Sequence, residues 1–163
     1  MQRFTIGILV AILLIFSTNH SGAANLRSLQ LGTSPFYVMI PNDYVEGEMT
    51  EEDKKDDMVG YYFSENELMD FDVYQFSKDD EPKKLLDYAK KEANEFNADV
   101  VRDKINGIQV VYYIANEMYD KKMYPTLTYI FDTKTEYVEI VFWLDGDEAT
   151  KQAMEIINTL KKN

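Results

Sequence analysis

The stretch of sequence that decides the fold covers residues 107–147 and reads GIQVVYYIANEMYDKKMYPTLTYIFDTKTEYVEIVFWLDGD. Three of its segments, residues 109–116, 125–131 and 137–144, are dense in β-branched and aromatic side chains. That composition is typical of a pleated, half-buried surface, so we expect three consecutive strands. Apolar side chains lie on both faces of the third segment, which indicates a strand covered on both sides.

Polar segments separate these three strands. Residues 132–135 read DTKT and predict a tight hairpin between the second and third strands. Residues 118–124 read MYDKKMY and predict a longer, seven-residue connection between the first and second. The meander then needs helices on at least one face, and those must come from other parts of the chain.

The remaining sequence supplies further strands and two helices. Strands are expected at residues 36–40, 59–63, 71–76 and 99–105, the last turned into the meander by Asn106-Gly107. One helix is expected at residues 82–97, with Leu85, Ala89, Ala93 and Phe96 on its apolar stripe. A last helix follows Asp145, which with Glu148 resembles a capping box; its expected buried residues are Ala149, Ala153, Ile156, Ile157 and Leu160.

This order of elements predicts an α+β fold. We expect a mainly antiparallel sheet of about six to seven strands flanked by two helices. Residues 36–163 form the expected single domain, and residues 25–35 are interpreted as a leader to it.

The first 24 residues have the pattern of a secretory signal peptide. Arg3 precedes an apolar run at residues 4–16, and small residues follow up to Ala24. The run is short for a membrane span, which needs about 20 apolar residues. We therefore expect cleavage near Ala23 or Ala24 and a location outside the cytoplasm, secreted or on the periplasmic or extracellular face of the envelope. An uncleaved anchor is the alternative, and it is the only membrane attachment we expect.

Composition restricts the possible chemistry. The chain has no cysteine, and its only histidine, His20, lies in the signal segment. The mature chain therefore lacks the side chains for Ser-His-Asp or Cys-His catalysis and for a His- or Cys-ligated metal. The net charge of −12 repels nucleic acid and anionic lipid. We expect no catalytic residues, no cofactor and no nucleic acid partner.

The layout resembles the PsbP-like fold, which is shared by photosystem PsbP proteins, the Ran-binding Mog proteins and bacterial envelope proteins such as DcrB. Three segments carry the resemblance: the opening FYVMIP at residues 36–41, the strand YVEIVF at residues 137–142, and the closing IINTL at residues 156–160. Tyr44 supplies the aromatic residue that usually follows the proline turn, whereas the usual glycine is missing. The resemblance implies a non-enzymatic binding domain in the envelope or secreted, and it supplies no catalytic residues.

The candidate partner surface consists of Met118, Tyr119, Met123 and Tyr124. Methionine and tyrosine adapt well to partner surfaces, so we expect a protein partner here. The alternative is that these residues end two strands and pack across the hairpin. Trp143 is expected in the core under a helix. The paired tyrosines Tyr61-Tyr62 and Tyr112-Tyr113 are expected at core rims, with lining of a groove or edge as the alternative.

The acidic residues give weaker signals. Residues 46–57 are interpreted as a solvated loop, with cation binding as the alternative, although the spacing of a calcium loop is missing. Asp145, Asp147 and Glu148 are interpreted as helix-capping residues rather than cation ligands. The leading hypothesis is thus a non-enzymatic binding protein. The alternatives are a hydrolase using carboxylates in a tyrosine-lined cleft and an acidic cation-binding accessory protein.

Overall fold

A seven-stranded antiparallel sheet forms the centre of the molecule. The structure is a computed structural model that describes residues 25–64, 69–79, 81–119 and 121–163. The strand order across the sheet is β3 (Tyr44–Glu46), β4 (Met58–Ser64), β5 (Met69–Ser77), β9 (Glu136–Leu144), β8 (Lys122–Asp132), β7 (Ile108–Tyr119) and β6 (Val101–Ile105). This confirms the expected α+β class and the mainly antiparallel sheet, including the β7-β8-β9 meander.

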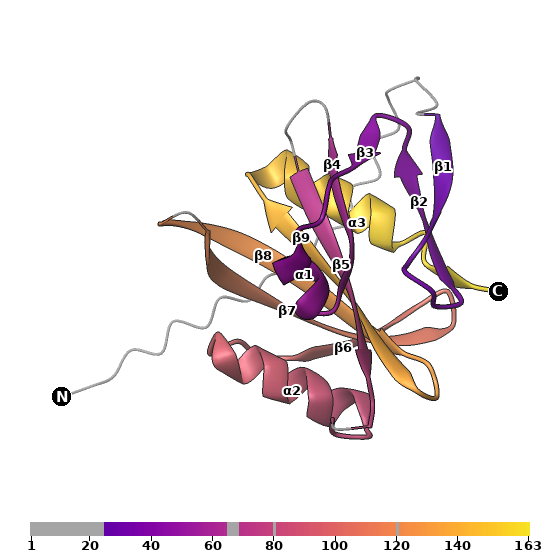
Figure 1. The fold of residues 1–163 in the computed structure, drawn as a ribbon, viewed down its shortest axis with the longest axis vertical. Coiled ribbons are helices and arrows are strands. Elements are labelled where there is room, and N and C mark those ends of the chain that lie inside the picture. Colours follow the sequence, from indigo (N-terminus) through magenta and orange to yellow (C-terminus); the bar gives the residue numbers. More distant parts are fainter. Residues whose placement is uncertain (1–24, 65–68, 80, 120) are drawn as a thin grey trace.

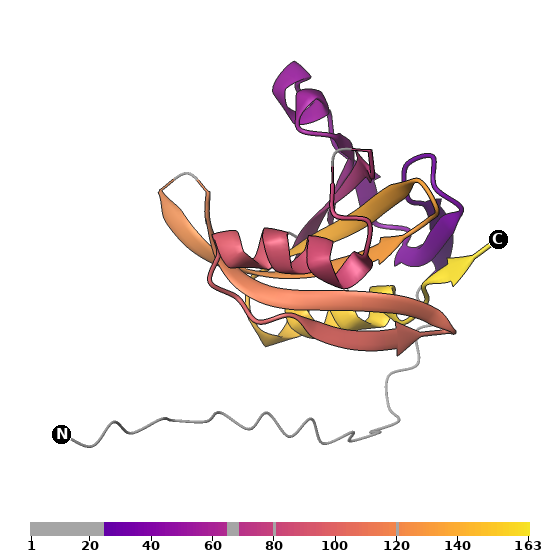
Figure 2. The same ribbon diagram turned by 90° about the horizontal axis from the view of Figure 1, so that it is seen from below.

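Helices cover both faces of this sheet. Figure 2 shows α2 (Leu85–Glu95) and α3 (Asp147–Ile157) on opposite sides of it, and we call these sides the α2 face and the α3 face. On the α2 face, Tyr88, Ala89 and Ala93 pack with Val111 and Tyr137. On the α3 face, all five residues of the expected apolar stripe of α3 are buried in the larger core, which accounts for the alternation of apolar side chains along β9.

A second, three-stranded sheet lies beside α3. Its order is β1 (Leu26–Gln30), β2 (Phe36–Pro41) and β10 (Lys161–Lys162), as Figure 1 shows at the right of the molecule. The interpretation of residues 25–35 as a leader needs correction, because this segment pairs with β2 and places Leu29 and Leu31 in the core. One strand with only two buried leucines has too little periodicity to be recognised without its partner.

Both long helices begin differently from the prediction. The N-cap of α2 is Lys84, without a side-chain hydrogen bond, so the helix starts after Pro82 rather than at it. The N-cap of α3 is Gly146, with φ of +91°, and no side chain caps it. The expected capping box of Asp145 and Glu148 is therefore wrong, because the chain enters α3 through a left-handed glycine and not through an extended acidic residue.

The connection between β7 and β8 is much shorter than predicted. The two strands pair as far as Met118 with Met123 and Tyr119 with Lys122, so the seven-residue connection is wrong, because only residues 120–121 remain between the last paired positions. The paired ends project beyond the rest of the sheet (Figures 1 and 2) and are called the arm, residues 116–119 and 122–125. The arm has no core on either side, so it lacks the apolar alternation by which a half-buried strand is recognised.

Candidate functional site

The four predicted surface residues lie on the arm, divided between its two faces. Met118, Tyr119 and Met123 are 71%, 67% and 51% exposed, and Tyr124 is half-buried. Side chains alternate along a strand, and directly paired residues share a face. Met118 and Met123 therefore extend the α3 face, whereas Tyr119 and Tyr124 extend the α2 face. The alternative interpretation is confirmed in part, because Met118 and Met123 pair directly across the hairpin at the ends of β7 and β8, but three of the four side chains are exposed.

The α2 face carries a groove beyond the end of α2. It has a volume of about 450 Å³ and is bounded by the arm, by β4, β5 and β9, and by the short helix α1 (Glu51–Lys55) with the residues before it. Four aromatic side chains line it: Tyr61, Tyr119, Tyr124 and Trp143. Four carboxylates also line it: Glu48, Asp53, Asp70 and Asp72.

Trp143 lies at the centre of the aromatic residues. Its ring centroid is 6.1 Å from that of Tyr119 at 59° between ring planes, and 6.4 Å from that of Tyr124 at 81°. The three rings are therefore inclined to one another and do not form a parallel stack. The prediction of Trp143 as a core residue under a helix is wrong: it is half-buried on the α2 face, where α2 does not reach.

Two of the groove's carboxylates are held by its aromatic residues. The Trp143 indole Nε1 donates to Asp72 Oδ2 at 2.7 Å, and the Tyr61 hydroxyl donates to Asp70 Oδ2 at 3.1 Å. Burial raises the pKa of Asp72 to about 6, because the Trp143 hydrogen bond only partly offsets desolvation and Asp70 lies nearby. Burial, with the charge of Asp70, likewise raises the pKa of Tyr61 to about 12.

The rim near α1 is fixed by local hydrogen bonds. Thr50 and Asp53 form a capping box, in which Asp53 Oδ2 accepts from the Thr50 backbone N at 2.6 Å. The hydrogen bond from the Thr50 side chain lowers the pKa of Asp53. At Gly47 a Cβ would lie 2.2 Å from Tyr61 Cδ1, so the missing side chain leaves room for the Tyr61 ring. Residues 46–57 thus contain the end of β3 and the helix α1, with irregular chain in between, so the expected loop is wrong for residues 51–55.

Two further acids lie on the α2 face between the groove and α2. Glu139 is 5% exposed and accepts from the Tyr88 hydroxyl at 2.6 Å. Burial raises its pKa to about 7. Glu117 accepts from Thr126 Oγ1 at 2.7 Å, and burial raises its pKa as well. Both acids accept hydrogen bonds from donors of the same face; Glu139 is buried and Glu117 is half-buried.

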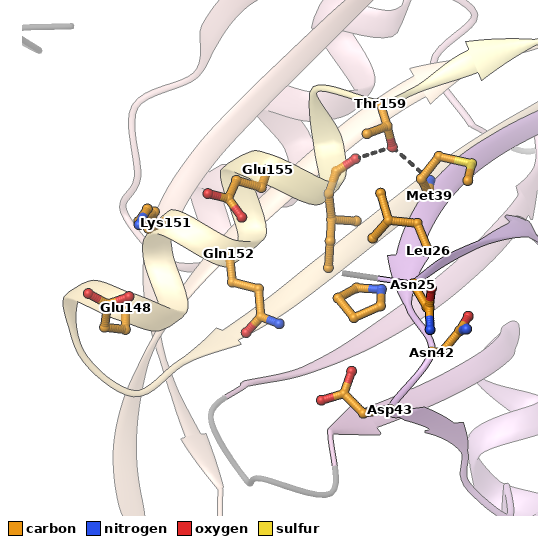
Figure 3. Close-up of a pocket in the computed structure, with 12 residues that line it drawn as sticks. Asn25, Leu26, Met39, Asn42, Asp43, Glu148, Lys151, Gln152, Glu155 and Thr159 are labelled. Carbon is orange, nitrogen blue, oxygen red and sulfur yellow. Dashed lines mark hydrogen bonds between the residues drawn. The ribbon is translucent and has the colours of Figure 1, made fainter. Parts of the chain in front are cut away.

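A larger hollow, of about 790 Å³, lies between β1, β2 and α3 (Figure 3). Leu26, Met39 and Ile156 give it an apolar lining, and its rim carries both signs of charge, with Glu148 beside Lys151. Thr159 bridges its end, accepting from the Met39 backbone N at 2.7 Å and donating to the Ile156 carbonyl at 2.6 Å. Charges of both signs select no ligand class, so we regard the smaller groove as the better candidate site.

The acidic residues do not form a metal site in the described part of the chain. No group of three or more histidine, cysteine, aspartate or glutamate side chains there is placed to hold a metal ion. Of residues 46–57, Glu48 and Asp53 instead face the groove. Asp147 and Glu148 occupy the first turn of α3, where acidic side chains interact favourably with the positive end of the helix dipole.

Sequence reasoning identified Tyr61, Tyr119 and Tyr124 as candidates but missed Asp70 and Asp72. A signal for these two was present, because residues 69–73 read MDFDV, which places both acids on one face of a strand. Their proximity to the arm was not readable, because β5 and β7 are separated in the sheet by β9 and β8.

Comparisons with known proteins identify the fold. No family model matches the chain, and no curated protein matches its sequence. The solution structure of cyanobacterial PsbP (CyanoP) from Synechocystis sp. PCC 6803 is similar, with a TM-score of 0.62 and 10% identity over 90% of this chain and 98% of that one. A crystal structure from Bacteroides thetaiotaomicron VPI-5482 has a TM-score of 0.56 and 21% identity, over 79% of this chain and 45% of that one. At these identities the likeness concerns the fold alone: the chain has a PsbP-like fold, as the sequence resemblance implied.

Proposed function

We propose that this protein is an exported, non-catalytic binding module that engages a protein partner through the arm. The single observation that carries the proposal is the exposure of Met118, Tyr119 and Met123 on a projecting hairpin. Large apolar side chains exposed together often mark interaction sites. Methionine and tyrosine are also the residue types that interfaces favour.

The apolar surface of the arm continues along the α3 face. Ile114, 63% exposed, precedes Met118 on that face of β7, and Met118 pairs with Met123 across the hairpin. Asn116 lies between Ile114 and Met118 on β7, but its partner across the hairpin is the exposed Pro125, so the apolar stripe continues through Pro125 to Met118 and Met123. A contiguous stripe can be covered by one partner segment.

Export is the second part of the proposal. It is supported by the signal-peptide pattern of residues 1–24, which lie outside the described residues. None of the helices in the described part of the chain has both the length and the apolar character of a membrane span. The proposed location is outside the cytoplasm, secreted or facing the envelope.

A hydrolase that uses carboxylates is the second candidate function, and one observation favours it. Asp70 and Asp72 lie two positions apart on β5 and line the same groove, and Asp72 has a raised pKa of about 6. Such a residue can donate a proton at neutral pH. However, Asp72 is 5% exposed and bonded to Trp143, so a substrate has little access to it. Loss of a hydrolytic activity in the Asp72→Asn variant would favour the hydrolase as the function of this protein.

The proposal is tested by photocrosslinking in the producing cell. A photoreactive amino acid is placed at Met118, at Met123 or, as a control, at Val101, which is 43% exposed on the edge strand β6. We expect one crosslinked protein from both arm positions and none from Val101. The same product from all three positions, or no product from the arm, would contradict the proposal.

Stability measurements complete this test. Replacing Met118, Tyr119 and Met123 together by serine is expected to abolish crosslinking from a photoreactive residue at Ile114, which is exposed on the same face of β7 just before the arm. Because the three side chains are exposed, each change should alter the free energy of unfolding by no more than about 0.5 kcal/mol. A loss of several kcal/mol in urea unfolding would show that the arm is a structural element instead.

A further inference from the structure

We propose that the groove on the α2 face binds an alkylammonium group, through the rings of Tyr119, Tyr124 and Trp143 and the carboxylates beside them. This deepens the proposed function, since Tyr119 and Tyr124 belong to both the arm and the groove. The group can come from a lysine side chain of a partner or from a free small amine. The two sources share the same chemistry.

The aromatic geometry is suited to a cation. Trp143 is flanked by Tyr119 and Tyr124, whose ring planes make angles of 59° and 81° with its own. Rings inclined in this way present π faces and edges around a shared space instead of filling it by stacking. A cation within about 6 Å of a ring centroid is attracted by the quadrupole of the ring, most strongly for tryptophan.

The charged residues that line the groove all have the same sign. Four of the ten described residues that line it are acidic and none is basic. The carboxylate of Asp72 accepts the indole hydrogen of Trp143, which increases the negative potential over the indole ring. The negative charges of Asp70, Asp53 and Glu117 each add to the rise that burial causes in the pKa of Asp72. A positive ligand relieves that repulsion, whereas an anion is repelled.

The chain itself places an ammonium on one of these rings. Lys122 Nζ lies 4.4 Å from the centroid of Tyr124, on the arm beside the groove. Lys122 is exposed and is not among the residues that line the groove. One face of the Tyr124 ring thus already contacts a cation of this class, and the rings of Tyr119 and Trp143 offer the same type of contact.

A metal ion fits this groove less well than an organic cation. Calcium takes six to eight oxygen ligands and magnesium needs octahedral oxygen coordination. Within the described residues, no three acidic side chains converge in that way. The groove is lined by as many aromatic residues as carboxylates, and aromatic rings attract an ammonium whose alkyl groups they can also contact.

The test uses Trp143 as its own reporter, because it is the only tryptophan in the chain. Its fluorescence is recorded while choline or Nα-acetyl-lysine amide is added at constant ionic strength. The neutral isostere of choline, 3,3-dimethylbutanol, and sodium chloride are the controls. We expect a saturable change with both amines and none with the controls. Tighter binding of the lysine derivative would assign the site to a partner's side chain, and tighter binding of choline to a free amine.

Matched variants on the two faces of the arm separate this inference from the proposed function. Tyr119→Ala with Tyr124→Ala should weaken alkylammonium binding roughly five- to fiftyfold. Met118→Ala with Met123→Ala, on the opposite face, should leave it unchanged while reducing partner crosslinking. Tyr119→Ala alone, at an exposed residue, keeps the test valid if the double tyrosine variant is destabilised.

Two results would overturn the inference: a response to 3,3-dimethylbutanol equal to that of choline, or amine binding unaffected by Tyr119→Ala in a folded protein. Either can occur while partner crosslinking through Met118 and Met123 persists, which would leave the proposed function standing. Conversely, amine binding without any crosslinked partner would support the alkylammonium site in the groove and would contradict partner binding through the arm.

Discussion

At the residue scale, the polar groups of the α2 face are the most informative feature. Asp72, Glu117 and Glu139 are each bonded to a donor from the same side of the molecule: Trp143, Thr126 and Tyr88 respectively. A buried carboxylate without a donor costs free energy, so these bonds explain why the acids are tolerated there. Desolvation still dominates, and the pKa of all three is raised.

The raised pKa of Glu139 predicts how stability depends on pH. Its pKa is about 7 in the folded protein and lies near its ordinary value of 4.5 in the unfolded chain. Between these values the folded state binds more protons, so the free energy of unfolding is greatest below about pH 4.5 and falls as pH rises toward 7. Above pH 7 the contribution of this group is constant. Asp72 and Glu117 add contributions of the same sign.

Glu139→Gln tests this dependence. Glutamine keeps an acceptor for the Tyr88 hydroxyl and removes the titration, so the fall in stability between pH 4.5 and 7 should shrink by roughly 1–3 kcal/mol. Urea unfolding across this range measures it. Glu95→Gln, at an exposed position of α2, controls for the loss of one charge. Identical pH profiles for the parent and Glu139→Gln would refute the assignment.

At the element scale, the β6–β7 turn connects the sheet to the end of α3. Asn106 and Gly107 both have positive φ, 49° and 87°, as the Asn-Gly pair predicts for a tight hairpin. The Asn106 side chain also donates to the carbonyls of Asn158 and Leu160 at 2.9 and 3.0 Å. Asn106 thus has two roles: its backbone adopts the positive φ of the turn, and its side-chain amide donates the two hydrogen bonds.

Two variants separate these roles. Asn106→Gly keeps the left-handed backbone and loses the two hydrogen bonds, so we expect a loss of about 0.5–1 kcal/mol. Asn106→Ala loses the bonds and also strains the turn, which should raise the loss to about 1–3 kcal/mol. Denaturant unfolding gives both values. Equal stability of the glycine variant and the parent would show that the bonds to α3 contribute nothing.

At the scale of the whole molecule, the N-terminal strand completes the larger core. Leu31 is fully buried and Leu29 is nearly so, and both belong to the core cluster that contains Phe36 and Ile157. The ring of Phe36 packs edge-on against Phe131 of the large sheet at 4.7 Å between centroids. Through these contacts the three-stranded sheet closes the α3 face.

Leu31→Ala should therefore lower the free energy of unfolding by about 2–5 kcal/mol, the usual cost of a large buried truncation. Leu26→Ala, at a residue 48% exposed in the same strand region, is the control and should change it by less than about 0.5 kcal/mol. Thermal or urea unfolding distinguishes them. Similar small losses in both variants would mean that residues 25–35 are a leader after all.

Export is also a property of the whole chain. Intact-mass measurement of protein recovered from the producing cell should give an N-terminus near Ala24 or Asn25. Such a chain retains all of β1. Recovery of cytoplasmic protein that still begins at Met1 would rule out the signal peptide and return His20 to the list of possible ligands.

The sequence by itself determined the elements whose side chains repeat with a clear period and whose contacts are local. It predicted the meander, the Asn106-Gly107 turn, the buried stripe of α3 and the PsbP-like α+β class. These features are encoded in neighbouring residues, because alternation, helical spacing and turn chemistry act over a few positions.

Only the tertiary structure decided where β1 and β10 pair, how far the arm extends, and that Trp143 faces a groove. Each depends on contacts between distant segments: Leu31 needs the core beside β2, and Asp72 needs Trp143, 71 residues away. Trp143 is left uncovered on the α2 face because α2 does not extend over it, and no local sequence pattern predicts this. The sequence thus indicated aromatic residues as candidates for binding. Their proximity to Asp70 and Asp72 could be seen only in the folded sheet.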